Sequence, residues 1–285
     1  MIPGRAPDRS TVSDRVNQLP PFHPTVLRLL TVSMESDSAV DDFEDIFKCD
    51  PALAADLLVV ANSAAFGLRA TISSIRHALA LLGLERVSSL SFTIAMQFYM
   101  RQTPRMASVQ PIWSHALATA LIAEILGDIR RTTCRGLYTT ALMHDVGRLG
   151  LLMSAGREYA DLLSKKFPDI GESLLYEANR LGTTHVEAGD VLAEKWCFPP
   201  EMRSCIRRHH EEAAAGNSDE LMKLIRIACG IATRIGYGEV NCENAETPDR
   251  ILKEAAPELL AHPKLAPEQL RSHVQKRLVY CHSVR

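Results

Sequence analysis

The sequence has no excess of charge of either sign. Its 32 Lys and Arg residues stand against 34 Asp and Glu residues, a formal net charge of −2. Without a positive field the chain does not attract nucleic acid or anionic lipid over a distance, which argues against a nucleic-acid-binding domain. No uncharged apolar run approaches the ~18–20 residues that span a bilayer, and the opening MIPGRAPDRS lacks the apolar core of a signal peptide. We therefore expect a soluble, cytoplasmic protein.

Paired cysteines are lacking as well. The seven cysteines are odd in number, none belongs to a CxxC pair, and they lie at positions 49, 134, 197, 205, 229, 242 and 281. This scatter indicates neither a disulfide framework nor a thiolate zinc site. We expect reduced thiols.

Strand periodicity is the third absence, because no segment sustains an alternation of apolar and polar residues. Hydrophobic residues make up 46% and charged residues 23% of the 285 residues, as in soluble globular proteins. Apolar residues instead recur at helical spacing, so the predicted fold is all-α. In the second half of the chain the predicted helices span residues 113–126, 137–153, 172–180, 185–195, 201–211 and 219–235.

The helical pattern breaks over residues 101–111, a mostly polar segment that contains Pro104 and Pro111. Polar, proline-containing segments are typical of boundaries between compact units. The predicted organisation is an N-terminal tail over residues 1–14, a helical subdomain over 15–105, a helical lobe over 106–240 and a helical C-terminal extension over 241–285.

Imidazole and carboxylate groups on predicted helices, or at their ends, are the candidates for chemistry. Rigid helices can bring such groups together around first-row metals, and a pair of such metals activates a bridging water and holds a phosphate. The alternative is that these side chains only hydrogen-bond to one another and to the backbone, as buried polar groups must. Spacing does not distinguish the two. The candidates are His115, His144, Asp145, His185, His209 and His210.

Several segments resemble a known family. Those of the second half are similar to successive helices of the HD metal-dependent phosphohydrolase superfamily: HALATALIAEILG, ALMHDVGRLGLL, THVEAGDVLAEKWCFPPEM and IRRHHE. Those of the first half resemble the HDOD domain, the HD-related output domain of bacterial signalling proteins: LPPFHPTVLRLL, DPALAADLLVVANSAAFG and ISSIRHALALLGLERVSSL. The resemblance implies an N-terminal helical bundle packed on an HD-like helical lobe.

The resemblance also implies a metal, Fe, Mn or Zn, and roles for particular residues. The metal ligands of the cyclic-di-GMP phosphodiesterases in the HD-GYP branch match the six candidates above. Arg148 matches a lysine that meets the substrate phosphate in that branch. If the chain is an enzyme, Asp145 and Arg148 are its catalytic candidates.

Three departures from the HD-GYP branch argue against catalysis. Cys229 stands where HD enzymes carry a late aspartate, so a soft thiol replaces a carboxylate, and a buried inert cysteine is the alternative. Asp145 is then the only carboxylate that the pattern assigns to the site. Pro111 replaces a glutamate that precedes His115 in one subset of the branch, and no GYP triplet follows His210.

We therefore predict a non-catalytic signal-transduction output module that acts on a protein partner and retains a partial HD metal site. The alternative is a metal-dependent phosphohydrolase acting on a cyclic nucleotide or a nucleotide phosphate. A small phosphate ligand fits this alternative. Neither hypothesis involves nucleic acid or a membrane.

Overall fold

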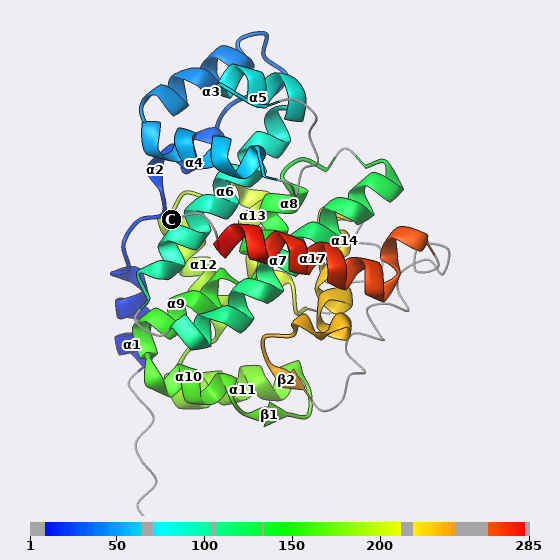
Figure 1. The fold of residues 1–285 in the computed structure, drawn as a ribbon. Coiled ribbons are helices and arrows are strands. Elements are labelled where there is room, and N and C mark those ends of the chain that lie inside the picture. The colour runs from blue at the N-terminus through cyan, green and yellow to red at the C-terminus, as the bar shows by residue number, and fades with distance from the viewer. Residues whose placement is uncertain are drawn as a thin grey trace, which may run out of the picture. The chain divides into compact units, whose positions relative to one another are not determined.

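The fold is almost entirely helical in the computed structural model, which describes residues 9–63, 71–103, 106–132, 134–211, 219–242 and 262–282 (Figure 1). Within these residues the only strands are β1 (Lys166–Phe167) and β2 (Asn241–Cys242), which pair in parallel. The predicted all-α fold is confirmed.

Contacts divide the chain into two units. The larger unit comprises Met1–Pro20 and Thr103–Leu270, and the smaller unit comprises Pro21–Gln102 and Arg271–Arg285. The boundaries that the sequence predicts, after residues 14, 105 and 240, stay predictions.

Helix starts in the smaller unit follow local capping rules. Asp50 accepts a hydrogen bond from the backbone N–H of Leu53, and Pro51 is the first helical residue after it, where its fixed φ fits the helix and its missing N–H has no partner to lose. In the core of this unit, the rings of Phe22 and Phe92 stack with centroids 5.8 Å apart. The helices are α2 (Pro24–Leu29), α3 (Ala39–Lys48), α4 (Pro51–Ala61), α5 (Ile75–Leu82) and α6 (Leu84–Arg101).

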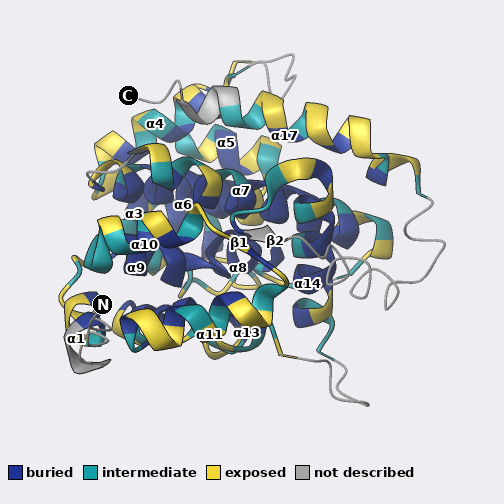
Figure 2. Cartoon of the chain, turned by 90° about the horizontal axis from the view of Figure 1, so that it is seen from below, coloured by how far each residue is buried: buried dark blue, intermediate teal, exposed yellow. Residues whose placement is uncertain are grey.

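The larger unit contains two groups of three packed helices. α7 (Met106–Arg130) packs against α8 (Leu137–Met143) and α14 (Glu220–Ala232), and α12 (His185–Lys195) packs against α9 (Val146–Ala155) and α13 (Pro200–Arg208). Buried residues run along α7 and α8, drawn dark blue in Figure 2. The remaining elements are α1 (Arg9–Asn17), α10 (Arg157–Leu163), α11 (Ile170–Leu181), the π-helix η1 (Thr233–Tyr237) and the 3-10 turn η2 (Pro263–Leu265); α17 (Pro267–His282) crosses into the smaller unit.

The start of α7 differs from the prediction, which placed the helix over residues 113–126. The helix begins at Met106 and contains Pro111. A proline removes one backbone hydrogen bond. Val109 before Pro111 and Ile112 after it are both buried, and this packing holds the helix in the core, so the lost bond does not end it.

Length and mean hydropathy alone would allow α7 to cross a membrane. Within Ala107–Arg130 an 18-residue stretch has a mean hydropathy of 1.3, and 67% of that stretch is buried within the fold. A core helix of a globular protein has the same properties, and the burial of α7 fits that explanation.

Candidate metal centre

His144 and Asp145 lie at a break between two helices. The predicted helix over residues 137–153 is wrong at this point, because Asp145 has φ −109° and ψ 22°, outside the helical region. α8 therefore ends at Met143 and α9 begins at Val146. The break places both side chains at helix ends in the interior, and both are buried.

Helix ends also position three further candidates. The Thr184 side chain accepts from the backbone N–H of Glu187, whose carboxylate accepts from the Thr184 N–H in return. This capping box makes His185 the first residue of α12. His209 and His210 directly follow the last residue of α13.

One set of donors gathers around the carboxylate of Asp145. Its Oδ1 lies 3.3 Å from His185 Nε2 and 3.2 Å from His209 Nε2, and His210 Nε2 lies 3.0 Å from His185 Nε2. The four donor atoms lie within 4.8 Å of one another. We call Asp145, His185, His209 and His210 the Asp145 position.

A second set of donors comes from the interiors of α7 and α14 together with the end of α8. Cys229 Sγ lies 3.5 Å from His115 Nε2, and the His115 and His144 rings are 5.2 Å apart. Donor atoms of these three residues lie within 4.8 Å of one another. We call His115, His144 and Cys229 the Cys229 position. The structure thus brings all six predicted candidates and Cys229 into two adjacent sets.

Four of the histidines are oriented by a hydrogen bond from Nδ1. Because carbonyl and carboxylate oxygens only accept, Nδ1 carries a proton in each ring, and neutral rings present the lone pair of Nε2. Bonds of this kind fix the tautomer and the orientation of metal-binding histidines. They run from His115 to Tyr237 O at 2.8 Å, from His144 to Ala141 O at 2.7 Å, from His209 to Ile206 O at 2.9 Å and from His185 to Glu177 Oε2 at 2.7 Å.

The donor atoms facing the centre are unsatisfied. His144 Nε2, His209 Nε2 and Asp145 Oδ1 are buried and have no hydrogen-bond partner among the described residues. Buried polar atoms without a partner are rare in native proteins, because each loses its hydration without compensation. Converging, buried and unsatisfied nitrogen and oxygen donors fit a first-row divalent metal.

Two buried glutamates belong to the centre although no motif indicated them. Glu177 of α11 accepts from both the backbone N–H and Nδ1 of His185, at 2.8 and 2.7 Å. Glu239 Oε2 lies 2.9 Å from His115 Nδ1. The sequence pattern assigns only Asp145 to the site, and the structure places these two further carboxylates beside the candidate histidines. Their positions depend on the tertiary fold. Glu177 lies in α11, which a short loop joins to α12, and Glu239 follows the end of η1.

The guanidinium of Arg148 pairs with the carboxylates of Asp145, Glu177 and Glu239. Its Nε lies 3.1 Å from Asp145 Oδ2, its Nη1 donates to Glu177 Oε1 at 3.2 Å, and its Nη2 lies 3.3 Å from Glu239 Oε1. Tyr159 Oη donates to the same Glu177 oxygen at 3.0 Å. The Arg148 side chain is 0% exposed, so the guanidinium that the resemblance assigned to a substrate phosphate is engaged by buried carboxylates.

The imidazoles of the centre differ in basicity. Burial lowers the pKa of His144 to about 3, and repulsion from His209 and His115 adds to this effect, whereas Asp145 opposes it. Burial and the neighbouring His209 also lower the pKa of His210 well below its ordinary value. Both rings are therefore neutral at neutral pH.

The carboxylates are ionised. Burial alone would raise the pKa of Asp145, but Arg148 and His185 together hold it well below the ordinary value. A neighbouring histidine and Arg148 likewise hold the pKa of Glu177 and of Glu239 below their ordinary values, against the effect of burial. The centre combines the neutral imidazoles of His144 and His210 with anionic oxygen donors, and this combination attracts a cation.

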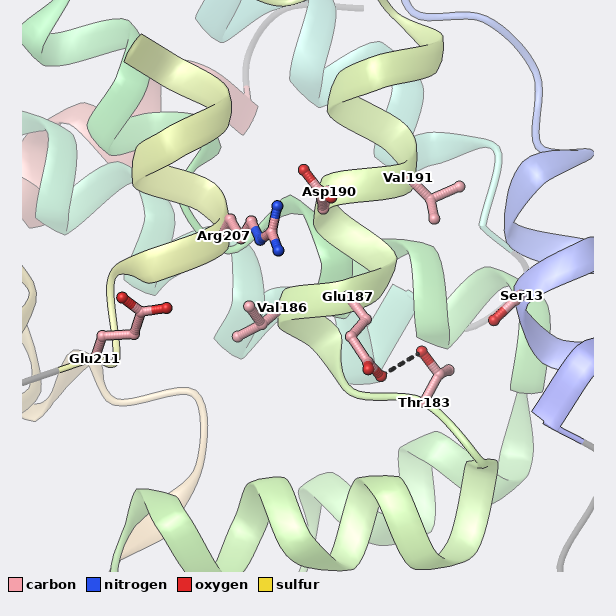
Figure 3. Close-up of a pocket in the computed structure, with 8 residues that line it drawn as sticks. All are labelled: Ser13, Thr183, Val186, Glu187, Asp190, Val191, Arg207 and Glu211. Atoms are coloured by element: carbon pink, nitrogen blue, oxygen red, sulfur yellow. Dashed lines mark hydrogen bonds between the residues drawn. The ribbon is translucent and has the colours of Figure 1, made fainter. Parts of the chain in front are cut away.

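Most of the centre is buried, whereas His210 and Cys229 are partly exposed. His115, Asp145, His185 and His209 are each at most 4% exposed. A pocket of about 440 Å³ opens beside α12 and α13 (Figure 3), with Asp190 and Arg207 among its eight lining residues. None of the eight is a candidate ligand.

Comparison with known proteins gives relatives of the same fold. The crystal structure of an HDOD domain protein of unknown function from Geobacter sulfurreducens is similar with a TM-score of 0.71 and 23% identity, over 97% of each chain. That of a candidate phosphohydrolase from Shewanella amazonensis SB2B is similar with a TM-score of 0.66 and 20% identity, over 96% of this chain and 97% of that one. At these identities the likeness shows the fold.

A curated relative from Treponema pallidum (strain Nichols), an uncharacterized protein, is 24% identical over 214 residues, or 70% of this chain. The match spans 39% of that relative's length. The HDOD domain, which is related to HD phosphohydrolases and associated with signalling, matches residues 19–212. Since this match covers more than half of the 285 residues, the chain belongs to the HDOD domain family.

Proposed function

We propose that this chain is a signalling output module whose larger unit binds a divalent first-row metal ion, Fe²⁺, Mn²⁺ or Zn²⁺, at the Asp145 position. The module acts on a protein partner rather than by hydrolysis. The observation that carries the metal site is the set of histidines whose Nδ1 atoms are held by acceptor oxygens, which turns their Nε2 atoms toward the buried carboxylate of Asp145. When bound, the metal supplies positive charge where donor atoms now lack partners.

Burial supports the non-catalytic part of the proposal. A phosphodiester must reach the metal and its water, yet the donor residues of the Asp145 position other than His210 are at most 4% exposed. Arg148 already neutralises carboxylates that would otherwise offset two metal charges. A thiol stands at Cys229, where HD enzymes have a carboxylate. Each feature weakens a two-metal hydrolytic site.

The second candidate function is a metal-dependent phosphohydrolase acting on a cyclic nucleotide or a nucleotide phosphate. The adjacency of two donor sets favours it, because paired metals are the usual means of activating water toward phosphodiesters. Turnover therefore separates the two candidates.

The metal site is tested by purifying the full chain without added metal, measuring its metal content and then titrating Fe²⁺, Mn²⁺ or Zn²⁺ anaerobically. We expect thermal stabilisation of about 2.7 kcal/mol when the free ion reaches a hundredfold of its Kd. His209→Gln should abolish the stabilisation by Mn²⁺, whereas His77→Ala on α5 should retain it. Absence of bound metal and of stabilisation with all three ions would contradict the metal site.

Hydrolysis is tested with the metal-loaded chain at high concentration, using cyclic-di-GMP and a simple chromogenic phosphodiester. We expect no multiple turnover, because most of the donor residues are buried and Arg148 already pairs with the carboxylates. Multiple turnover by the unmodified chain that His144→Ala abolishes would refute the non-catalytic proposal and establish the phosphohydrolase.

A further inference from the structure

The Cys229 position offers a donor type that the Asp145 position does not have. Cys229 lies in the interior of α14, and its Sγ is 3.5 Å from His115 Nε2 on α7. α7 and α14 pack directly against each other, so two rigid helices hold this pair. The thiol of Cys229 and the imidazole of His115 are therefore held in a fixed arrangement.

A second observation points to a ligand at the same place. His144 Nε2 is buried and has no hydrogen-bond partner among the described residues, while Nδ1 of the same ring donates to Ala141 O. The ring cannot rotate to satisfy Nε2 without losing that bond. His144 is 0% exposed, and the carboxylate oxygen Oδ2 of Asp145 lies 3.7 Å from its Nε2, too far for a hydrogen bond. A buried donor atom of this kind needs a further partner.

The size of the set fits a small ion. Donors bonded to tetrahedral zinc at ~2.0–2.3 Å lie about 3.3–3.8 Å from one another. The Cys229–His115 distance of 3.5 Å falls within this range, and all three donors lie within 4.8 Å. Glu239 and Asp145 form another set with His115, but the Glu239 carboxylate lies 2.9 Å from Nδ1, which is bonded to Tyr237 O.

We propose that the Cys229 position binds a second metal ion and that the Cys229 thiolate makes this position selective for thiophilic ions, Zn²⁺ or Fe²⁺, over Mn²⁺ and Mg²⁺. Sulfur and imidazole donors favour the former, whereas carboxylate and water oxygens favour the latter. Binding forms a metal–sulfur bond and releases the thiol proton, and any proton on His115 Nε2, to solvent. The inference rests on the proposed metal-binding function and extends it to a mixed centre with one oxygen-containing and one sulfur-containing position.

Cobalt(II) is the probe for the experiment, because thiolate ligation gives it an intense near-ultraviolet charge-transfer band that nitrogen and oxygen ligands do not give. The full chain is titrated anaerobically with Co²⁺ alone, and both absorbance and bound cobalt per chain are measured. We expect the charge-transfer band in the unmodified chain. Cys229→Ser should eliminate the band and lower the stoichiometry by about one cobalt per chain, with the Asp145 position still occupied.

Cys205→Ser is the matched control, since Cys205 likewise lies on a helix of the larger unit and belongs to neither donor set. It should retain the band. Cys229→Asp should retain two bound ions but shift the preference of the second from Zn²⁺ toward Mn²⁺ in competition experiments, as an oxygen donor replaces sulfur.

The outcomes separate the two proposals. Cobalt bound without a charge-transfer band, or a band that survives Cys229→Ser, would overturn the thiolate position and leave the Asp145 position intact. No bound cobalt in any variant would overturn both. Loss of the band in Cys205→Ser as well as in Cys229→Ser would trace it to general disruption and would also overturn the inference.

Discussion

Replacing Arg148 with methionine is expected to lower the free energy of unfolding by about 3–5 kcal/mol. The reason is the charge that the substitution leaves behind. Arg148 is fully buried and lies within 3.3 Å of Asp145, Glu177 and Glu239. Methionine fills a similar volume but leaves these carboxylates facing one another without a cation. Urea denaturation measures the loss.

The control for this experiment is Arg208→Met, which removes an exposed arginine paired with Glu211 and should change the stability little. Combining Arg148→Met with Glu177→Gln should recover part of the loss, because one of the uncompensated charges is removed. An Arg148→Met chain as stable as the unmodified one would show that the buried cation does not hold the centre together.

Replacing Gly147 with alanine is expected to destabilise the chain by about 3 kcal/mol or more, although alanine is the better helix former. A Cβ at Gly147 would lie 1.8 Å from the backbone oxygen of His185 and 2.5 Å from the backbone nitrogen of Gly189. Both atoms belong to the backbone of α12 and cannot move without it, so α9 and α12 must separate. Asp145 directly precedes α9 and His185 is the first residue of α12, so metal binding should weaken as well.

Gly150→Ala on the same helix is the matched control. Its Cβ would meet the end of the Leu192 side chain at 2.8 Å, and a side chain can rotate away. The two variants gain the same helix propensity, so the difference between their unfolding free energies isolates the backbone contact. Equal stabilities for the two variants would mean that α9 and α12 do not need to approach at Gly147.

The helical fold and the candidate donors could be predicted because they depend on local pattern. Helical spacing of apolar residues identifies a helix without knowledge of its neighbours, and the resemblance to the HD pattern rests on the order of residues such as His115 and Asp145. The break at His144 was not predictable, since the apolar pattern continues across it and no glycine or proline stands at the junction itself.

The glutamates of the centre were beyond prediction for a different reason. Glu177 meets His185 only after a loop returns the chain, and Glu239 meets His115 only after Gly236 takes a φ of 96° beyond the end of α14. Their function depends on a charge balance around Arg148 that no short motif encodes. The burial of Arg148 follows from the same charge balance. If its side chain lay at the surface, three carboxylates would be buried without a cation.

The pairing of β1 with β2 bears on the order in which the chain folds. It joins Lys166 to Asn241 in parallel and so brings the segment that carries Glu239 back to the connection between α10 and α11. The hydrogen bond from His115 to Tyr237 joins residues that are 122 positions apart in the sequence. Contacts so distant in sequence form slowly, because a long loop must close before any of them is made. The donor sets are thus completed after most helices have docked. A metal that binds them acts mainly by slowing the unfolding of the finished chain, without speeding its folding.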